Sequence, residues 1–198
     1  MKANSDGVRF AQPSDAAELA ALHAESISIG FLVMLGPRFL ERLYRRITTG
    51  RGSFALVSVT ESGRVIGFVA VAEDTRRLYR DFIRHDGVHA GLSAAPAVLR
   101  HPLKVIETLR YGVDGSSEKP GAEILATAVA TDAQGRGIGG ALVGAAIAEL
   151  KARGIEQAHV VTAADNDAGL RTYFQCGFQR HETVVVHRGV RQEVLVWP

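Results

Sequence analysis

The stretch Gln134-Gly135-Arg136-Gly137-Ile138-Gly139-Gly140 decides the fold of this chain. It comes shortly after an apolar run over 124–129 and opens a helical run of small residues over 141–150. Where a strand, a glycine turn and a helix follow one another, backbone N–H groups approach an anion closely, and the helix N-terminus adds about half a positive charge. Arg136 adds a mobile cation that pairs with phosphate oxygens. The stretch predicts a phosphate cradle; a glycine turn that only caps a helix is the alternative.

The spacing of these glycines also satisfies a dinucleotide-binding fingerprint. Gly135, Gly137 and Gly140 form the pattern G-x-G-x-x-G, which should follow its strand directly and stand early in a long α/β domain. Here residues 131–134 separate the apolar run from the first glycine, and only 58 residues follow Gly140. That length is too short for the rest of a doubly wound sheet, so the sequence does not favour a nucleotide-dependent oxidoreductase.

The pattern Gln134-x-x-Gly137-x-Gly139 resembles the acetyl-CoA pyrophosphate loop of the GNAT superfamily of N-acetyltransferases, which also lies past the middle of the chain. A second segment, NDAGLRTYFQCGF over 166–178, begins 32 residues after Gln134 and resembles the second GNAT signature. Its residues predict a short amphipathic helix, which Asp165 or Asn166 caps and which ends at a left-handed glycine. Two signatures in the correct order identify the chain as a GNAT-like protein.

The bulk composition indicates one ordinary soluble domain. The chain has 198 residues, of which 46% are hydrophobic and 22% charged, and this suits a single globular core. Its 23 basic and 21 acidic residues form no basic block, so we expect no nucleic-acid partner. Cys176 is the single cysteine, and no apolar run reaches the length of a membrane span. We therefore expect a cytoplasmic monomer or homodimer with no signal segment and no membrane association.

The order of apolar and turn segments predicts the element sequence β-α-α-β-β-α-β-α-β-α-β-β, which matches the GNAT fold. We expect one α/β (α+β) domain over 1–198, with a mixed central sheet of about six to seven strands flanked by helices. Residues 75–121 form an insert before the fourth strand, with helices near 78–83 and over 98–111 and a loop over 114–121. In GNAT enzymes this region walls the acceptor pocket, so the resemblance implies the same role for the insert.

The resemblance also implies how the donor, acetyl-CoA, is held. In the family, backbone amides of the glycine loop hold the pyrophosphate, and the fourth strand pairs with the pantetheine chain. An N–H group near Val129 then faces the thioester oxygen as a one-donor oxyanion site. The residues that match these positions are Ala128, Val129, Ala130, Gln134, Gly135, Arg136, Gly137, Ile138, Gly139 and Gly140.

Two residues of the second signature have further roles in the family. Tyr173 resembles the tyrosine that gives a proton to the departing CoA sulfur, and a phenol with a pKa of about 10 is protonated at neutral pH. A core side chain on an amphipathic helix is the alternative for Tyr173. Asn166 resembles the residue that hydrogen-bonds the pantetheine arm; a plain helix cap is its alternative, and both roles can hold together.

Glu123 is the candidate general base. It begins the predicted fourth strand, 11 residues before Gln134, and some GNAT members carry a catalytic glutamate at that place. A partly desolvated carboxylate with a raised pKa can take the proton that an amine must lose before it attacks. A solvated glutamate at the strand end is the alternative, because many family members rely on water chains. Glu73, Asp74 and His159 are weaker base candidates.

These features predict an N-acetyltransferase that moves an acetyl group from acetyl-CoA to a primary amine by direct attack in a ternary complex. We favour a small-molecule amine because the long insert indicates an enclosed pocket. A non-catalytic acyl-CoA-binding sensor or scaffold, and a protein N-terminal or lysine acetyltransferase, are the alternatives. No metal is expected, because His85, His89 and His101 lie at irregular spacing without cysteines.

Overall fold

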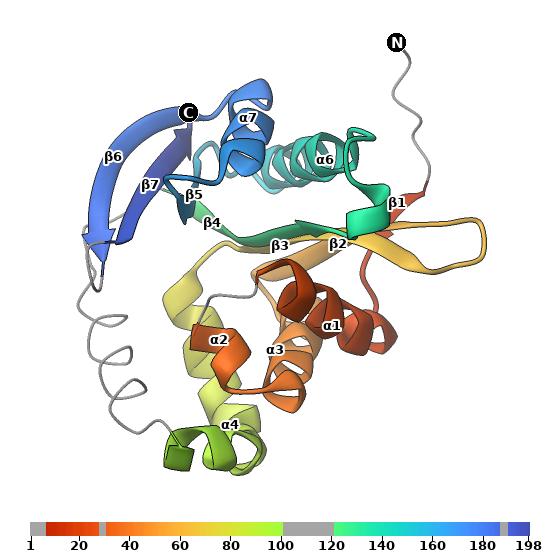
Figure 1. Ribbon diagram of the computed structural model, residues 1–198, viewed down its shortest axis with the longest axis vertical. Helices are drawn as coiled ribbons and strands as arrows, with labels where there is room; N and C mark the ends of the chain where they lie inside the picture. The colour runs from red at the N-terminus through yellow and green to blue at the C-terminus, as the bar shows by residue number, and fades with distance from the viewer. Residues whose placement is uncertain (1–6, 28–30, 101–120, 187–189) are drawn as a thin grey trace.

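The computed structural model describes residues 7–27, 31–100, 121–186 and 190–198. Its elements follow the predicted order, with one additional short helix, α2, between the first two predicted helices (Figure 1). They are β1 (Val8–Phe10), a 3-10 turn (Pro13–Asp15), α1 (Ala16–Ser26), α2 (Phe31–Met34), α3 (Pro37–Thr49), β2 (Ser53–Val59), β3 (Val65–Ala72), α4 (Thr75–Arg100), β4 (Ala122–Val129), a second 3-10 turn (Thr131–Ala133), α6 (Ile138–Ala152), β5 (Ala158–Ala163), α7 (Asp167–Gln175), β6 (Gln179–Val186) and β7 (Val190–Trp197).

The strands form one mixed 7-stranded sheet in the order β1-β2-β3-β4-β5-β7-β6. The β4–β5 pair is parallel, and the other neighbouring strands are antiparallel. Helices α6 and α7 cover one face, and α1 to α4 lie on the other (Figure 1). The predicted GNAT-like mixed sheet, flanked by helices and with a helix inserted before the fourth strand, is confirmed.

A hydrophobic core lies on each face of the sheet. One packs α1, α3 and α4 against the strands through residues such as Leu40 and Phe68. The other packs α6 and α7 through residues such as Leu142 and Tyr173. Because both faces are covered, β3 is buried along its whole length and is apolar at every position, as expected of a central strand.

The strands β4 and β5 separate in the middle of the sheet. They pair over only three positions, Ala122–Ile124 against Ala158–Val160. Immediately afterwards the register of β4 against β3 shifts, which leaves Leu125 as the extra residue of a β-bulge. A bulge bends its strand and increases the local twist. The edge of β4 over residues 125–129 therefore has no strand neighbour on the β5 side within the described chain.

Strand β6 begins at Gln179, although its apolar residues start only after Thr183, because backbone pairing to β7 holds the polar residues of this edge strand in place. The first predicted helix of the insert is present as α4, which continues to Arg100. The predicted helix over 98–111 and the predicted loop over 114–121 lie almost entirely outside the described residues.

Candidate active site

The glycine stretch forms a turn that leads directly into α6. Gly135 and Gly137 have φ values of 75° and 80°, in the left-handed region that favours glycine. Among the described residues no side chain caps α6, and a helix cannot satisfy the N–H groups of its own first turn, here Ile138 to Gly140. A Cβ atom added at Gly137 would meet nothing within 4 Å. The turn thus directs unpaired donors and the positive end of a helix dipole into open space, as an anion site requires.

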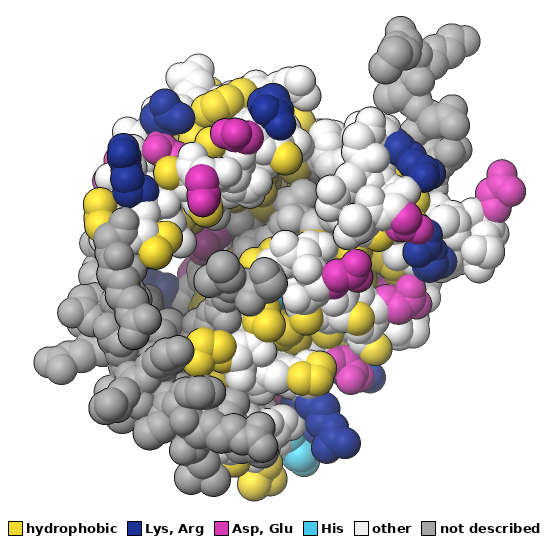
Figure 2. Space-filling model, viewed as in Figure 1, with side chains coloured by type: hydrophobic (Ala, Val, Ile, Leu, Met, Phe, Trp, Pro, Cys, Tyr) yellow, Lys and Arg dark blue, Asp and Glu magenta, His cyan; other side chains and the backbone are white. Residues whose placement is uncertain are grey.

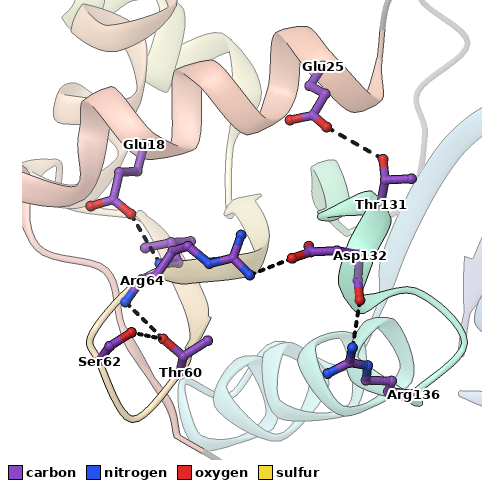
Figure 3. Close-up of polar contacts among 9 residues, drawn as sticks. Glu18, Glu25, Thr60, Ser62, Arg64, Thr131, Asp132 and Arg136 are labelled. Atoms are coloured by element: carbon purple, nitrogen blue, oxygen red, sulfur yellow. Dashed lines mark hydrogen bonds and ion pairs between the residues drawn. The ribbon is translucent and has the colours of Figure 1, made fainter.

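Polar side chains behind the turn hold it in place (Figure 3). The guanidinium of Arg136 donates to the backbone carbonyl of Asp132 at 2.7 Å, and the Asp132 carboxylate pairs with Arg64 of the β2–β3 turn at 2.7 Å. Glu18 of α1 accepts from the N–H of Val65 at 3.1 Å, beside Arg64. Exposed ion pairs contribute little to stability, so these contacts chiefly orient the loop. A guanidinium has about five N–H donors, so Arg136 keeps donors for an anion.

The open edge of β4 presents backbone groups next to this cradle. The N–H of Ala130 donates to the carbonyl of Ile66 at 2.9 Å, so the backbone of Ala130 points toward β3. Backbone direction alternates along a strand, which puts the groups of Ala128 on the β3 side and those of Val129 on the open side. The side chain of Gln134 donates to the Val129 carbonyl at 3.1 Å and joins the loop to this edge.

Helix α7 places Tyr173 on the same face of the sheet as the cradle. The side chain is buried, and its ring packs edge-on against Phe178 with centroids 5.5 Å apart. Burial raises the pKa of Tyr173 above its ordinary value, and the hydroxyl of Thr127 acts in the opposite direction. With a pKa on balance above that of an exposed phenol, Tyr173 is protonated at neutral pH, as a proton donor must be.

Of the two predicted caps, Asn166 is the N-cap of α7. Its Oδ1 accepts from the N–H of Gly169 at 3.0 Å, and its Nδ2 donates to Thr162 Oγ1 at 2.9 Å. The helix ends at Gly177, whose φ of 91° is left-handed. The thiol of Cys176, next to this end, has a pKa that burial raises, so it is a poor nucleophile at neutral pH. The predicted contact between Asn166 and the pantetheine arm stays a prediction.

Glu123 lies on the other face of β4, toward α4. Thr75 at the start of α4 donates to Glu123 Oε2 at 2.6 Å, and His159 Nε2 lies 3.9 Å from the same oxygen. The carboxylate side chain is 26% exposed, whereas that of His159 is 6% exposed. Glu123 is therefore a half-buried carboxylate at the point where β4 and β5 separate.

A cavity of about 70 Å³ opens beside Glu123. His23 of α1, Tyr44 of α3 and Tyr79 of α4 line it with Glu123, and leucine and isoleucine side chains form most of the remaining wall. His23 Nδ1 and the Tyr44 hydroxyl are 2.6 Å apart, and burial lowers the pKa of His23. Although Tyr79 is 37% exposed, burial of its hydroxyl and the negative charge of Glu123 raise its pKa to about 12. At neutral pH the His23 ring and the two phenols are therefore uncharged, and they line the cavity together with Glu123.

Two of the weaker base candidates have other partners. Glu73 pairs with Arg153 at 2.8 Å, and Asp74 accepts from the N–H of Arg77 at 3.0 Å at the start of α4. His159 contacts Glu123 and does not line the cavity directly. The structure thus brings Glu123 to the cavity and uses Glu73 and Asp74 to hold α4 and α6 in place.

Other positions show less chemistry. A shallow hollow of about 520 Å³ lies between Phe10, Arg51 and Arg153, at the opposite end of α6 from the glycine loop, and no predicted site residue lines it. Within the described residues, no three His, Cys, Asp or Glu side chains lie together as metal ligands would, and His101 lies outside them. No helix in the described part of the chain is long and apolar enough to cross a membrane.

The two halves of the site meet at the gap between β4 and β5. The cradle and Tyr173 approach it from the α6–α7 face, and Glu123 with its cavity approaches from the α1–α4 face. Figure 2 shows this side of the molecule hollowed between the two helical layers, with hydrophobic side chains gathered below the hollow. A chain inserted along the open edge of β4 would reach both faces, which is the arrangement that the resemblance to the GNAT superfamily implies for the donor.

Sequence comparison agrees with this class. A profile of the acetyltransferase (GNAT) family matches residues 25–178, and the chain belongs to that family. A mycothiol acetyltransferase of Amycolatopsis mediterranei is 35% identical over 117 residues, which cover 58% of this chain and 36% of that protein. The chain spans 36% or less of the length of the curated relatives that it matches.

Solved structures share the fold at low sequence identity. A GCN5-related N-acetyltransferase from Kribbella flavida matches with a TM-score of 0.66 and 18% identity, covering 97% of this chain and 96% of that one. The ribosomal-protein-S18-alanine N-acetyltransferase of Escherichia coli matches with a TM-score of 0.61 and 14% identity, covering 97% and 92%. The profile confirms the predicted family, and the solved structures confirm the predicted fold.

Sequence reasoning missed four side chains that the structure brings to the site. His23, Tyr44 and Tyr79 line the cavity from α1, α3 and α4, and Thr127 lies next to Tyr173. Each of them also reads as an ordinary core or helix residue, and only the sheet topology places it here. His23 and Tyr44 contact one another but lie 21 residues apart, and this spacing is not a recognisable sequence motif.

Proposed function

We propose that the chain is an N-acetyltransferase that moves an acetyl group from acetyl-CoA to a primary amine of a small molecule, by direct attack in a ternary complex. The observation that carries this proposal is the open edge of β4, with an anion cradle at one end and Glu123 at the other. The phenol of Tyr173 lies buried on one face of β4, and the cavity beside Glu123 opens on the other face.

On the donor side, the N–H groups of Gly135 to Gly140 and the guanidinium of Arg136 would bind the pyrophosphate. The backbone of Val129 would pair with the pantetheine arm, and Asn166 would contact that arm from the start of α7. The fit is supported by the left-handed glycines, since larger side chains there would be strained and would fill the open space. When bound, acetyl-CoA supplies an activated acyl group.

On the acceptor side, Glu123 would take the proton that the amine loses as it attacks. Its position at the mouth of the cavity puts the carboxylate within reach of a group seated there. Tyr173, on the opposite face, would give its phenol proton to the departing sulfur. The two proton transfers occur on opposite sides of β4, so one carboxylate and one phenol serve the reaction without competing.

The cavity supports a small acceptor. Helix α4 contributes Thr75, Leu78 and Tyr79 to the Glu123 side, in keeping with a role for the 75–121 insert as the acceptor wall. The match to a mycothiol acetyltransferase supports a small-molecule amine. Acetylation of a protein N-terminus or lysine is the second candidate, since a ribosomal-protein-S18-alanine N-acetyltransferase of Escherichia coli shares the fold.

Isothermal titration with acetyl-CoA, with NADPH as the control ligand, tests the donor site first. We expect micromolar binding of acetyl-CoA and none of NADPH. Release of CoA thiol in the presence of a panel of small amines and N-terminal peptides then tests transfer. Turnover with small amines supports the proposal, turnover with peptides alone supports the second candidate, and binding without any turnover indicates a non-catalytic sensor.

The substitution Glu123→Gln should lower kcat/KM at neutral pH by about a hundredfold, because the amide cannot accept the proton. The affinity for acetyl-CoA should not change, because Glu123 lies away from the cradle. Activity should recover partly as pH rises, since a growing fraction of the amine is then deprotonated in solution.

The substitution Glu73→Gln is the matched control, because it removes a neighbouring carboxylate that pairs with Arg153. We expect it to retain the activity of the native protein. If Glu73→Gln loses activity and Glu123→Gln does not, Glu123 is not the base.

A further inference from the structure

The hydroxyl of Thr127 is buried and has no hydrogen-bond partner among the described residues. It is the one buried side-chain oxygen or nitrogen in the described part of the chain with this property. Such groups are rare, because burial removes water from a polar atom without replacing the lost hydrogen bond. The unsatisfied hydroxyl of Thr127, which lies in the candidate active site, is therefore a candidate for a functional role.

The bulge at Leu125 determines where this hydroxyl points. After the bulge, Ala126 and Ala128 belong to the core on the α1–α4 face, so the alternate residues Thr127 and Val129 face α6 and α7. A Cβ built on Gly139 would lie 3.8 Å from Val129 and 3.6 Å from Thr172 of α7. Thr127 thus projects from β4 toward α7, two residues before Val129.

Tyr173 follows Thr172 on α7 and is the partner that Thr127 approaches. The Thr127 hydroxyl lowers the pKa of Tyr173, against the larger effect of burial, which raises it. The two hydroxyls do not form a closed hydrogen bond in this structure. They come close to one another on the face of β4 that packs against α7.

A hydrogen bond from Thr127 to Tyr173 would change the acid strength of the Tyr173 phenol. A buried phenol is a weak acid, because its phenolate form lacks solvation, and a weak acid gives its proton to a thiolate slowly. A hydroxyl that donates to the phenolate oxygen stabilises the ionised form and makes the phenol a stronger acid. Thr127 can donate in this way because its own hydrogen is not committed elsewhere.

We propose that Thr127 is a positioning residue whose hydroxyl donates a hydrogen bond to the Tyr173 oxygen as that phenol protonates the departing sulfur. The inference rests on the proposed acyl transfer. The O–H bond of Tyr173 breaks, an S–H bond forms on the CoA thiolate, and the phenolate later regains a proton from water. Throughout this step Thr127 keeps its own proton.

The variant Thr127→Val tests the proposal, because valine has nearly the shape of threonine without the hydroxyl. We expect kcat to fall about tenfold, with the KM for acetyl-CoA changed by less than about twofold. The alkaline limb of the kcat profile should move to higher pH, since Tyr173 loses the group that lowers its pKa. Thr127→Ser should restore kcat and the profile.

A control separates this role from a structural one. Ser53 is also a buried hydroxyl, but it donates to the carbonyl of Ile47 at 3.0 Å, far from the site. Ser53→Ala should lower the melting temperature and leave kcat unchanged. Thr127→Val should leave the melting temperature unchanged or raise it, because it removes an unsatisfied buried group.

A second measurement does not depend on turnover. Tyrosinate absorbance, followed during alkaline titration and compared with the same titration of Tyr173→Phe, isolates the ionisation of Tyr173. The proposal predicts a higher pKa for Tyr173 in Thr127→Val than in the native protein. An unchanged pKa, or an unchanged kcat in an enzyme that Tyr173→Phe impairs, overturns it. Absence of turnover in the native protein overturns the proposed acyl transfer instead.

Discussion

The substitution Gly139→Glu is expected to lower the affinity for acetyl-CoA by at least about a hundredfold, or about 2.8 kcal/mol. Gly139 lies in the first turn of α6, and its added Cβ would meet Thr172 at 3.6 Å and Val129 at 3.8 Å, which are ordinary contacts. The backbone therefore tolerates the change, and glutamate is a better helix former than glycine. The rest of the side chain would fill the gap between β4 and α7 and put a negative charge at the cradle, where it repels phosphate.

The matched control is Gly144→Glu on the exposed side of the same helix. A Cβ at Gly144 meets no atom within 4 Å, so this variant adds the same charge and the same side chain away from the cradle. Titration calorimetry should give native affinity for Gly144→Glu and no measurable binding for Gly139→Glu. Native affinity in a folded Gly139→Glu protein would mean that the glycine turn does not hold the donor.

The elements that carry the cradle are local in sequence, and the sequence predicts them well. A left-handed glycine at a helix start and an asparagine that caps the next helix need only their neighbours. Gly137 and Asn166 accordingly occupy the predicted positions in the structure. The same holds for β3, whose continuous apolar run forms a strand that is buried from Val65 to Ala72.

The direction of each group on β4 could not be predicted in this way. The faces of Thr127 and Val129 depend on the bulge at Leu125, and a bulge is visible only once β4 is paired with β3. Simple alternation counted from Glu123 would place Thr127 on the α1–α4 face. The extra residue Leu125 shifts the alternation and places Thr127 on the α6–α7 face instead.

The cavity has a similar non-local origin. Its walls come from α1, α3, α4 and β4, and the pair His23 and Tyr44 forms only when two helices pack together. Neither residue has a local signature of function. The sequence predicts a donor site because glycines and caps are short-range signals, whereas an acceptor site is assembled from ordinary residues on elements far apart in the chain.

The substitution Tyr173→Phe is expected to lower kcat by about 10- to 100-fold while the affinity for acetyl-CoA stays native. Phenylalanine keeps the ring, including its packing on Phe178, and removes only the hydroxyl. Without that hydroxyl, the thiolate must leave unprotonated or take its proton from water. Some activity should survive, because a thiolate is already a moderately stable leaving group.

Stopped assays of CoA thiol release and titration calorimetry on the same preparation separate the two effects of Tyr173→Phe. A loss of affinity together with kcat would assign the hydroxyl to donor binding, and an unchanged kcat would remove it from the chemistry. The expected split, a lower kcat at constant affinity, follows from the position of Tyr173. It lies beside the middle of the open β4 edge, opposite Thr127, whereas the donor's charge would be held at the glycine turn at the end of that edge. Removing the hydroxyl therefore changes the environment of the sulfur and not the contacts of the phosphates.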